Sequence, residues 1–347
     1  MLFPHPVLAS ETLEATVIEV LEERTIESAG EFQQPRLYQK LKLEVTKGSL
    51  VGEALEIESG HVPVINLPQY LVGDRVLVSC EVNSENMQTC FITEYLRRGA
   101  LIWLFIIFVL VSVLVARGWG GASLLGMVFS FLVIFLLILP QISKGSNPLL
   151  VTVLGSFLII PVSFYLSHGV NKKTSVAVVS TLAALIITGI LGVVFVDFAR
   201  LTGFSSDEAA FLQTATQGVV NIKGLVLAGI MIGALGVLDD ITIAQSSVVF
   251  NLKEVNPRLN SKRLFWRAMK VGRDHISSMV NTLVLVYAGA SLPLLLLFTD
   301  SGRMLSEVVN YEIIAEEIVR TLVGSIGLIL AVPITTFLAV ILADREA

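Results

Sequence analysis

The chain has 347 residues, of which 54% are hydrophobic and 15% are charged, and its formal net charge is −5. Soluble domains carry about 25% charged residues, and the mean hydropathy of +0.78 is correspondingly high. This balance excludes an ordinary soluble protein. It offers no basic surface for nucleic acid, so we expect no nucleic-acid partner.

The first 96 residues predict a small β domain outside the membrane. Short stretches that alternate apolar and polar residues predict five or six strands, separated by Gly, Asn and Pro. An open sheet of this size is marginally stable on its own, so we expect closure into a small OB-like barrel. The clearest stretches are 15–20, 38–45, 54–58, 75–79 and 89–95.

Both cysteines of the chain fall in this domain. A symmetric hairpin loop at 83–87 places Cys80 opposite Cys90, at a spacing from which a disulfide forms. Two separate buried thiols are the alternative. A disulfide favours a location outside the cytosol, because disulfides persist in oxidising compartments.

Residues 97–347 contain seven long apolar stretches. A helix needs about 20 apolar residues to cross a hydrocarbon layer of about 30 Å, and a span in lipid must pair its backbone groups internally. We therefore predict an all-α, polytopic bundle of seven spans. Their approximate limits are 99–116, 119–140, 147–168, 174–197, 222–246, 276–299 and 320–343.

The predicted loop at 253–274 sets the orientation. It carries seven basic and two acidic residues, so the positive-inside rule places it in the cytoplasm. Counting spans from this loop places the β domain outside and the C-terminus inside. The N-terminus shows no signal peptide or anchor, so we expect a longer form of the chain to carry another hydrophobic segment before the β domain. The alternative is that the first span pulls the β domain across the membrane.

Two adjacent aspartates interrupt the fifth predicted span. Charges inside a bilayer cost about 2.5–3.5 kcal/mol on insertion scales and usually face a cavity or a partner. On a helix, Asp239, Thr242 and Ser246 share one face, and Asp240 lies on the neighbouring face. We predict that this span binds a ligand or ion. The alternative is that an aspartate caps a separate helix that begins at Ile241.

A second polar cluster opens the sixth predicted span, with Asp274, His275, Ser278 and Asn281 on overlapping faces. It enters from the same side as the aspartate pair, which predicts one acidic cavity between the fifth and sixth spans. Carboxylates, a histidine and hydroxyls suit a hard cation or a proton relay. A helix start stabilised by the carboxylate of Asp274 is the alternative. The candidate metal ligands are Asp239, Asp240 and Asp274.

Four stretches resemble the YibE/F family of bacterial membrane proteins. This resemblance implies a multi-pass protein of the bacterial cytoplasmic membrane, presumed to be a permease, with a β domain ahead of its spans. Members of the family begin with a membrane segment before the β domain, whereas this sequence begins without one. The stretches are 225–239, 272–283, 287–293 and 323–333.

Together these features predict a transporter for a small solute or ion, without enzyme activity or cofactor, embedded in a lipid bilayer. The sequence is compatible with a homo-oligomer as well as with a monomer. A membrane-anchored binding, assembly or sensor protein that uses the β domain is the first alternative. An intramembrane enzyme is less favoured, because residues 236–239 lack a Gly-x-Gly-Asp arrangement and the chain has no HExxH or GxSxG motif.

Overall fold

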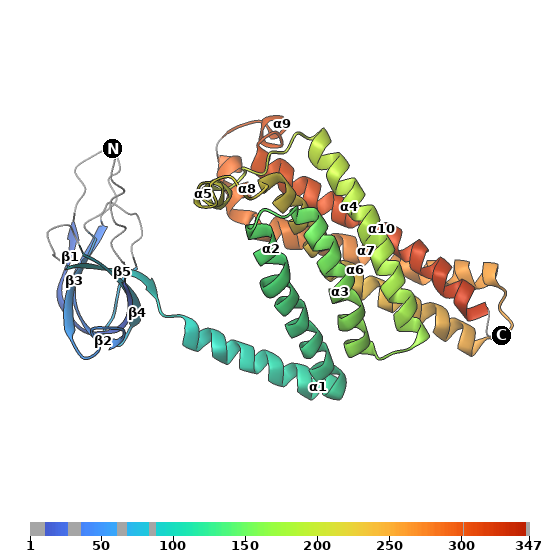
Figure 1. Cartoon of the computed structure of the whole chain (residues 1–347), viewed down its shortest axis with the longest axis horizontal. Helices are drawn as coiled ribbons and strands as arrows, with labels where there is room; N and C mark the ends of the chain where they lie inside the picture. The colour runs from blue at the N-terminus through green and yellow to red at the C-terminus, as the bar shows by residue number, and fades with distance from the viewer. Residues whose placement is uncertain (1–10, 27–35, 61–67, 83–87, 301, 345–347) are drawn as a thin grey trace. The chain divides into compact units, whose positions relative to one another are not determined.

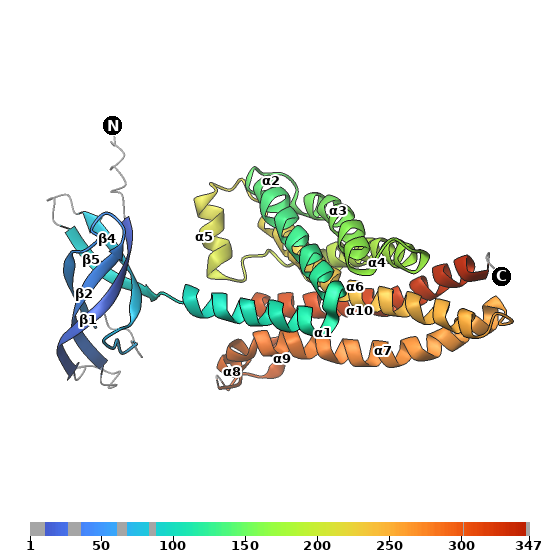
Figure 2. The ribbon, with the colours of Figure 1, turned by 90° about the horizontal axis from the view of Figure 1, so that it is seen from below.

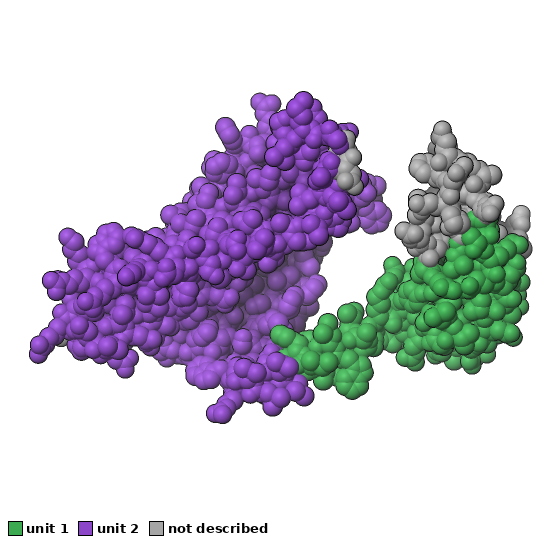
Figure 3. All heavy atoms as spheres, turned by 180° about the vertical axis from the view of Figure 1, so that it is seen from behind, with its two compact units in different colours: residues 1–108 green, residues 109–347 purple. Residues whose placement is uncertain are grey.

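The computed structural model describes residues 11–26, 36–60, 68–82, 88–300 and 302–344 (Figure 1). The chain divides into two compact units, residues 1–108 and 109–347 (Figure 3). The first unit holds the strands and the start of the first helix. The second holds the remaining helices.

One antiparallel sheet makes up the β domain. Its strands lie in the order β3-β2-β1-β4-β5, and all five clearest predicted stretches form strands. The described residues contain no ladder between β3 and β5, so the sheet is not closed and the OB-like barrel is not confirmed. The strands are β1 (Glu11–Ile26), β2 (Arg36–Lys47), β3 (Ala54–Ser59), β4 (Arg75–Val82) and β5 (Gln88–Tyr95).

The sheet covers its apolar face by curling around it (Figure 1). Register shifts interrupt the pairing of β1 with β2, and such bulges bend and twist a strand. Strand β1 pairs with β4 through its first half and with β2 along most of its length. The curvature buries alternate apolar side chains, among them Leu13, Leu41, Leu43 and Val78.

The predicted disulfide is present in this domain. Cys80 on β4 lies directly opposite Cys90 on β5. The two residues are bonded, with Cα atoms 4.1 Å apart. The predicted hairpin loop at 83–87 lies outside the described residues.

Helices account for nearly all of the second unit. Asn147, Asn171, Asn221 and Asn260 each cap a long helix by accepting a hydrogen bond from a backbone N–H three residues later, a strongly preferred N-cap arrangement. The helices are α1 (Arg98–Val133), a π-helical turn (Ile134–Ile138), α2 (Leu139–Ser143), α3 (Pro148–His168), α4 (Lys172–Phe198), α5 (Asp207–Ala215), α6 (Ile222–Val255), α7 (Ser261–Ala290), α8 (Leu292–Asp300), α9 (Leu305–Val308) and α10 (Glu312–Asp344).

Five helices among the described residues are long and apolar enough to cross a membrane, or six if α7 and α8, bent by 68°, form one span. This is consistent with a membrane protein, but the seven predicted spans are not confirmed. One of the two missing spans is the bent pair of α7 and α8, and the other falls in the stretch 98–143, which counts as one 46-residue helix. Its length of about 69 Å is roughly twice the hydrocarbon thickness, and its backbone is non-helical at Arg117.

The prediction of a loop at 253–274 is wrong. Helix α6 continues to Val255 and α7 begins at Ser261. Leu264, Ala268 and Gly272 recur every four residues and are buried. This helical spacing is easily overlooked among the many basic residues of the segment. The start of α7 is therefore an amphipathic helix with its basic side chains on the exposed face.

Helices α4, α6 and α10 pack against one another and form the centre of the bundle. Helix α3 covers α4 and α6, and α7 runs along α10 (Figure 2). A glycine allows one close approach: a Cβ at Gly327 of α10 would lie 2.1 Å from Oγ1 of Thr188 on α4. Small residues of this kind let membrane helices pack backbone to backbone.

Candidate functional site

The two aspartates of α6 lie within a continuous helix. The N-cap of α6 is Asn221, so neither Asp239 nor Asp240 begins a helix and the capping alternative is wrong. Asp239 is half-buried and Asp240 is exposed. Asp240 interacts electrostatically with His168 at the end of α3.

The other two residues of the predicted polar face point towards α4. The Oγ1 atoms of Thr242 and Thr181 lie 2.7 Å apart, at hydrogen-bonding distance. Ser246 donates a hydrogen bond of 2.8 Å to the backbone carbonyl of Lys173. Both Thr242 and Ser246 are fully buried. They link α6 to α4 and do not face the predicted cavity beside α7.

The polar cluster of α7 lies far from the start of its helix. The N-cap of α7 is Asn260, which excludes the capping role considered for Asp274. Asp274, Ser278 and Asn281 are exposed, and His275 is half-buried. The Nδ1 atom of His275 is buried and has no hydrogen-bond partner among the described residues.

These carboxylates do not gather at a metal site. Nowhere in the described part of the chain do three or more His, Cys, Asp or Glu side chains come close enough to hold a metal ion. Among the described residues, the candidate metal ligands Asp239, Asp240 and Asp274 therefore belong to no group that could hold a metal ion.

Gln245 makes the polar link between α6, α7 and α10, a role that the sequence reasoning missed. Its Nε2 donates to the Thr336 hydroxyl at 2.7 Å and to the Ala268 carbonyl at 3.2 Å. Its side chain is fully buried, and its Oε1 has no hydrogen-bond partner among the described residues. A lone amide within an apolar run was the available signal, because such a group seeks partners on neighbouring helices.

The first turns of α10 hold a network of charged side chains. Glu316 is buried and accepts hydrogen bonds from Arg320 Nη2 at 2.5 Å and from Ser205 Oγ at 2.6 Å. Arg320 Nη1 also lies 3.3 Å from Glu317. We call these three residues of α10 the acid–arginine network. The i, i+4 spacing of Glu316 and Arg320 predicts their pairing, but only packing buries it.

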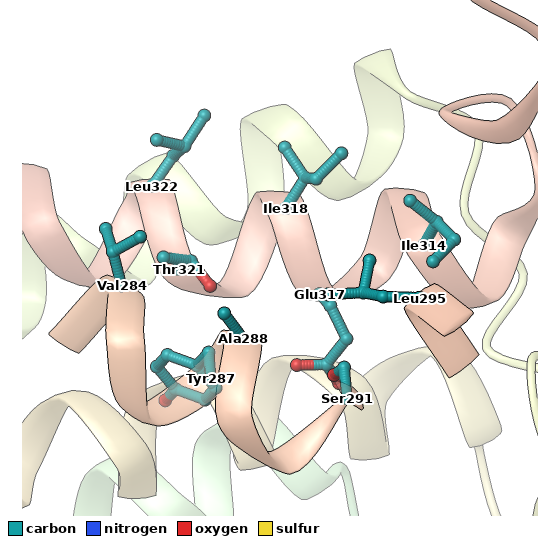
Figure 4. A pocket seen from close by; sticks show the side chains of 10 residues that line it. All are labelled: Val284, Tyr287, Ala288, Ser291, Leu295, Ile314, Glu317, Ile318, Thr321 and Leu322. Atoms are coloured by element: carbon teal, nitrogen blue, oxygen red, sulfur yellow. The ribbon is translucent and has the colours of Figure 1, made fainter. Parts of the chain in front are cut away.

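Two cavities flank the acid–arginine network. One, of about 270 Å³, lies between α7, α8 and α10 (Figure 4). The second, of about 240 Å³, includes Glu316 and Arg320 together with residues of the segment 203–212. We call the first the α7–α10 cavity. Glu317 and Ser291 both line this cavity (Figure 4).

A family model supports the assignment made from the sequence. The model of YibE/F-like proteins matches residues 104–345, which is well over half of the chain. The chain belongs to the YibE/F-like family. No curated protein and no solved structure matches it. The matched range includes the aspartates of α6, the polar cluster of α7 and the acid–arginine network, so all three belong to the family region of this YibE/F-like chain.

A glycine of α6 makes room for one wall of the α7–α10 cavity in this YibE/F-like protein. Tyr287 on α7 lines the cavity. A Cβ built at Gly233 would lie only 2.7 Å from the Tyr287 hydroxyl. The glycine therefore allows the phenol to reach α6 while its ring stays at the cavity.

The chemistry available at this end of the bundle is electrostatic. The network holds two carboxylates and one guanidinium, and Ser205 supplies a further donor. Such a group can attract, orient and exchange a charged or polar solute. Among the described residues, the charged side chains that line the two cavities are those of the acid–arginine network and Glu208.

Proposed function

We propose that this YibE/F-like protein is a permease for a small solute or ion. The observation that carries the proposal is the acid–arginine network, which lies in α10 with a cavity on either side. Charged groups in membrane helices are costly, and they usually mark substrate or ion pathways. A purely structural protein has little need for such a group beside two cavities.

We propose seven spans for the membrane domain. Helix α1 is split at Arg117, where its backbone is non-helical, and α7 with α8 counts as one bent span. The basic face of α7 then lies in the cytoplasm by the positive-inside rule. The C-terminus lies on the same side, and the β domain lies outside the bacterial cell membrane, where its disulfide persists. In this topology the acid–arginine network is near the outer end of α10.

We place the inner end of the proposed pathway at six of the eight residues predicted from the sequence. Asp239 and Asp240 lie towards the inner end of the membrane part of α6 in this topology. Between the two ends lies Thr188 of α4, beside Gly327 of α10, and its buried hydroxyl donates a hydrogen bond to the carbonyl of Ala184. A solute can pass this contact only if the helices separate, which requires an alternating-access motion. The inner group is Asp239, Asp240, Asp274, His275, Ser278 and Asn281.

Flux through proteoliposomes tests the proposal. Full-length protein is reconstituted, and uptake of small cations, anions and neutral solutes is compared with that of protein-free vesicles. Glu317→Gln and Asp239→Asn are expected to lower the flux of the transported solute. The matched control is Glu307→Gln on α9, because Glu307 is exposed and lies outside both cavities. Protein-dependent flux that neither substitution changes would show that these carboxylates do not serve transport.

A binding or assembly role of the β domain is the second candidate. Leu71 and Val72, in the turn before β4, are 59% and 63% exposed, and exposed apolar residues of this kind can serve an interface. Absence of flux for every solute, together with a self-association that Leu71→Ser abolishes, would favour this role. Light scattering of the purified protein would measure that homo-oligomer.

A further inference from the structure

The α7–α10 cavity lies at a break between two helices. Helix α7 ends at Ala290, α8 begins at Leu292, and their axes differ by 68°. Ser291 is the C-cap of α7 and lines the cavity. Its carbonyl accepts a hydrogen bond from the Leu295 N–H of α8, so the end of α7 and the start of α8 meet at the cavity wall.

The carboxylate of Glu317 brings a full negative charge to this cavity from α10. Glu317 makes no hydrogen bond within the described part of the chain, and its ionic partner Arg320 lies 3.3 Å away. Arg320 donates a shorter hydrogen bond, of 2.5 Å, to Glu316. One guanidinium therefore serves two carboxylates, and the carboxylate that faces the cavity is the less satisfied of the two.

The rest of the cavity is apolar and aromatic. Val284 and Ala288 line it from α7, Leu295 from α8, and Ile318 and Leu322 from α10 (Figure 4). Tyr287 adds a ring, and ring faces attract ammonium groups. The volume of about 270 Å³ is just below the usual range of about 300–1,000 Å³ for ligand pockets, so the cavity suits a small molecule.

We propose that the α7–α10 cavity binds a small amphipathic organic cation, which is the substrate class of the permease. The claim that this cation is transported rests on the proposed function. The claim that it binds rests on the cavity alone. The ammonium group lies against Glu317, within reach of the Tyr287 ring. The apolar body of the ligand packs among the aliphatic side chains.

Binding of three related probes tests the charge preference. Benzyltrimethylammonium is the cation, neopentylbenzene is its neutral carbon analogue, and benzenesulfonate is an anion of similar size. Each is titrated into full-length protein in a neutral detergent. The cation is expected to bind at least about tenfold more tightly than either analogue, given the strength of a partly desolvated charge pair. Equal affinity for the neutral analogue, or tighter binding of the anion, would overturn the proposal.

Substitutions then locate the site. Glu317→Gln is expected to weaken cation binding about tenfold and to leave the neutral analogue unchanged, whereas the control Glu307→Gln changes neither. Tyr287→Leu is expected to weaken cation binding and Tyr287→Phe to preserve it, because the ring supplies the attraction. Cation binding that Glu317→Gln leaves intact would place the ligand elsewhere.

A cavity-filling variant covers the case in which Glu317→Gln fails to fold. Ala288→Leu adds apolar volume inside the cavity without removing a charge, and it is expected to abolish binding of the cation. Thermal unfolding in the same detergent verifies that each variant is folded. A folded Ala288→Leu variant that binds benzyltrimethylammonium with the affinity of the parent would refute the site.

Flux separates this inference from the proposed function. Cation binding that depends on Glu317, without protein-dependent uptake into proteoliposomes, would overturn the permease and leave the site in place. Protein-dependent flux of another solute, with no binding of benzyltrimethylammonium, would overturn the site and leave the permease in place. Uptake of the cation that Glu317→Gln removes supports both.

Discussion

Removing the guanidinium of Arg320 should destabilise the helix bundle, because it leaves a buried carboxylate without its main partner. The side chain of Glu316 is only 9% exposed, whereas that of Arg320 is 26% exposed. The substitution Arg320→Leu keeps an apolar side chain that can replace the packing of the arginine stem. The loss is therefore electrostatic for the most part.

The size of the effect follows from this burial. Removing one partner of a buried ion pair costs about 3–5 kcal/mol. Arg320 is about one-quarter exposed, and Ser205 still donates to Glu316, so we take the lower limit, about 3 kcal/mol. The double substitution Glu316→Gln/Arg320→Leu removes the unpaired charge as well. It is expected to recover most of that loss.

Unfolding in detergent micelles, followed by tryptophan fluorescence, would measure all four proteins of this double-mutant cycle. The matched control is Arg258→Leu, because Arg258 is exposed and surface substitutions usually change stability by no more than about 0.5 kcal/mol. If Arg320→Leu is as stable as the parent, or if the double variant is no more stable than the single one, the reasoning about the buried pair is wrong.

Three further predictions concern other parts of the molecule. Gly272→Ala places a Cβ 2.5 Å from Cγ1 of Val332, and this overpacking should lower the free energy of unfolding by about 1–3 kcal/mol. The control Gly236→Ala, whose Cβ meets nothing within 4 Å, should leave the free energy of unfolding in detergent unchanged. A hydrogen bond from Arg98 holds the pKa of the Glu14 carboxyl below its ordinary value of 4.5. The stability that Glu14 confers is therefore complete above pH 4.5 and is lost as the pH falls through the lowered pKa, and amide exchange in β1 should lose this acid dependence in Glu14→Gln. Reducing the disulfide, which joins residues ten apart in sequence, should cost the β domain about 2.7 kcal/mol in a chain-entropy account, and amide exchange in β4 with and without reductant would measure it.

The sequence predicted the elements whose signals are local. Alternation of apolar and polar residues predicted the strands, and the symmetric spacing about the loop at 83–87 predicted that Cys80 faces Cys90. It failed where two signals overlap: the basic residues of 253–274 suggested a loop, although buried Leu264 and Ala268 show a helical period. The many basic residues dominate the composition of this segment, but the spacing of its apolar residues is what agrees with the observed helix.

The candidate site could be predicted only in part, for a physical reason. Residues on one face of a helix can be read from their spacing, so Thr242 and Ser246 do share a face. Which neighbouring helix meets that face depends on packing between segments far apart in the sequence. Their partners turned out to be Thr181 and Lys173 of α4, and the amide that reaches α7 belongs to Gln245.

The sequence by itself determined that this chain has long apolar helices and a small β domain, because the hydrophobic period and the length of each stretch act within that stretch. Tertiary structure alone decided where the charges meet. Glu316 and Arg320 lie one helical turn apart, but their burial against Ser205 and the cavities beside them depend on α5, α7 and α10 coming together. Burial is a property of the neighbours that a side chain acquires on folding, and no local pattern specifies those neighbours.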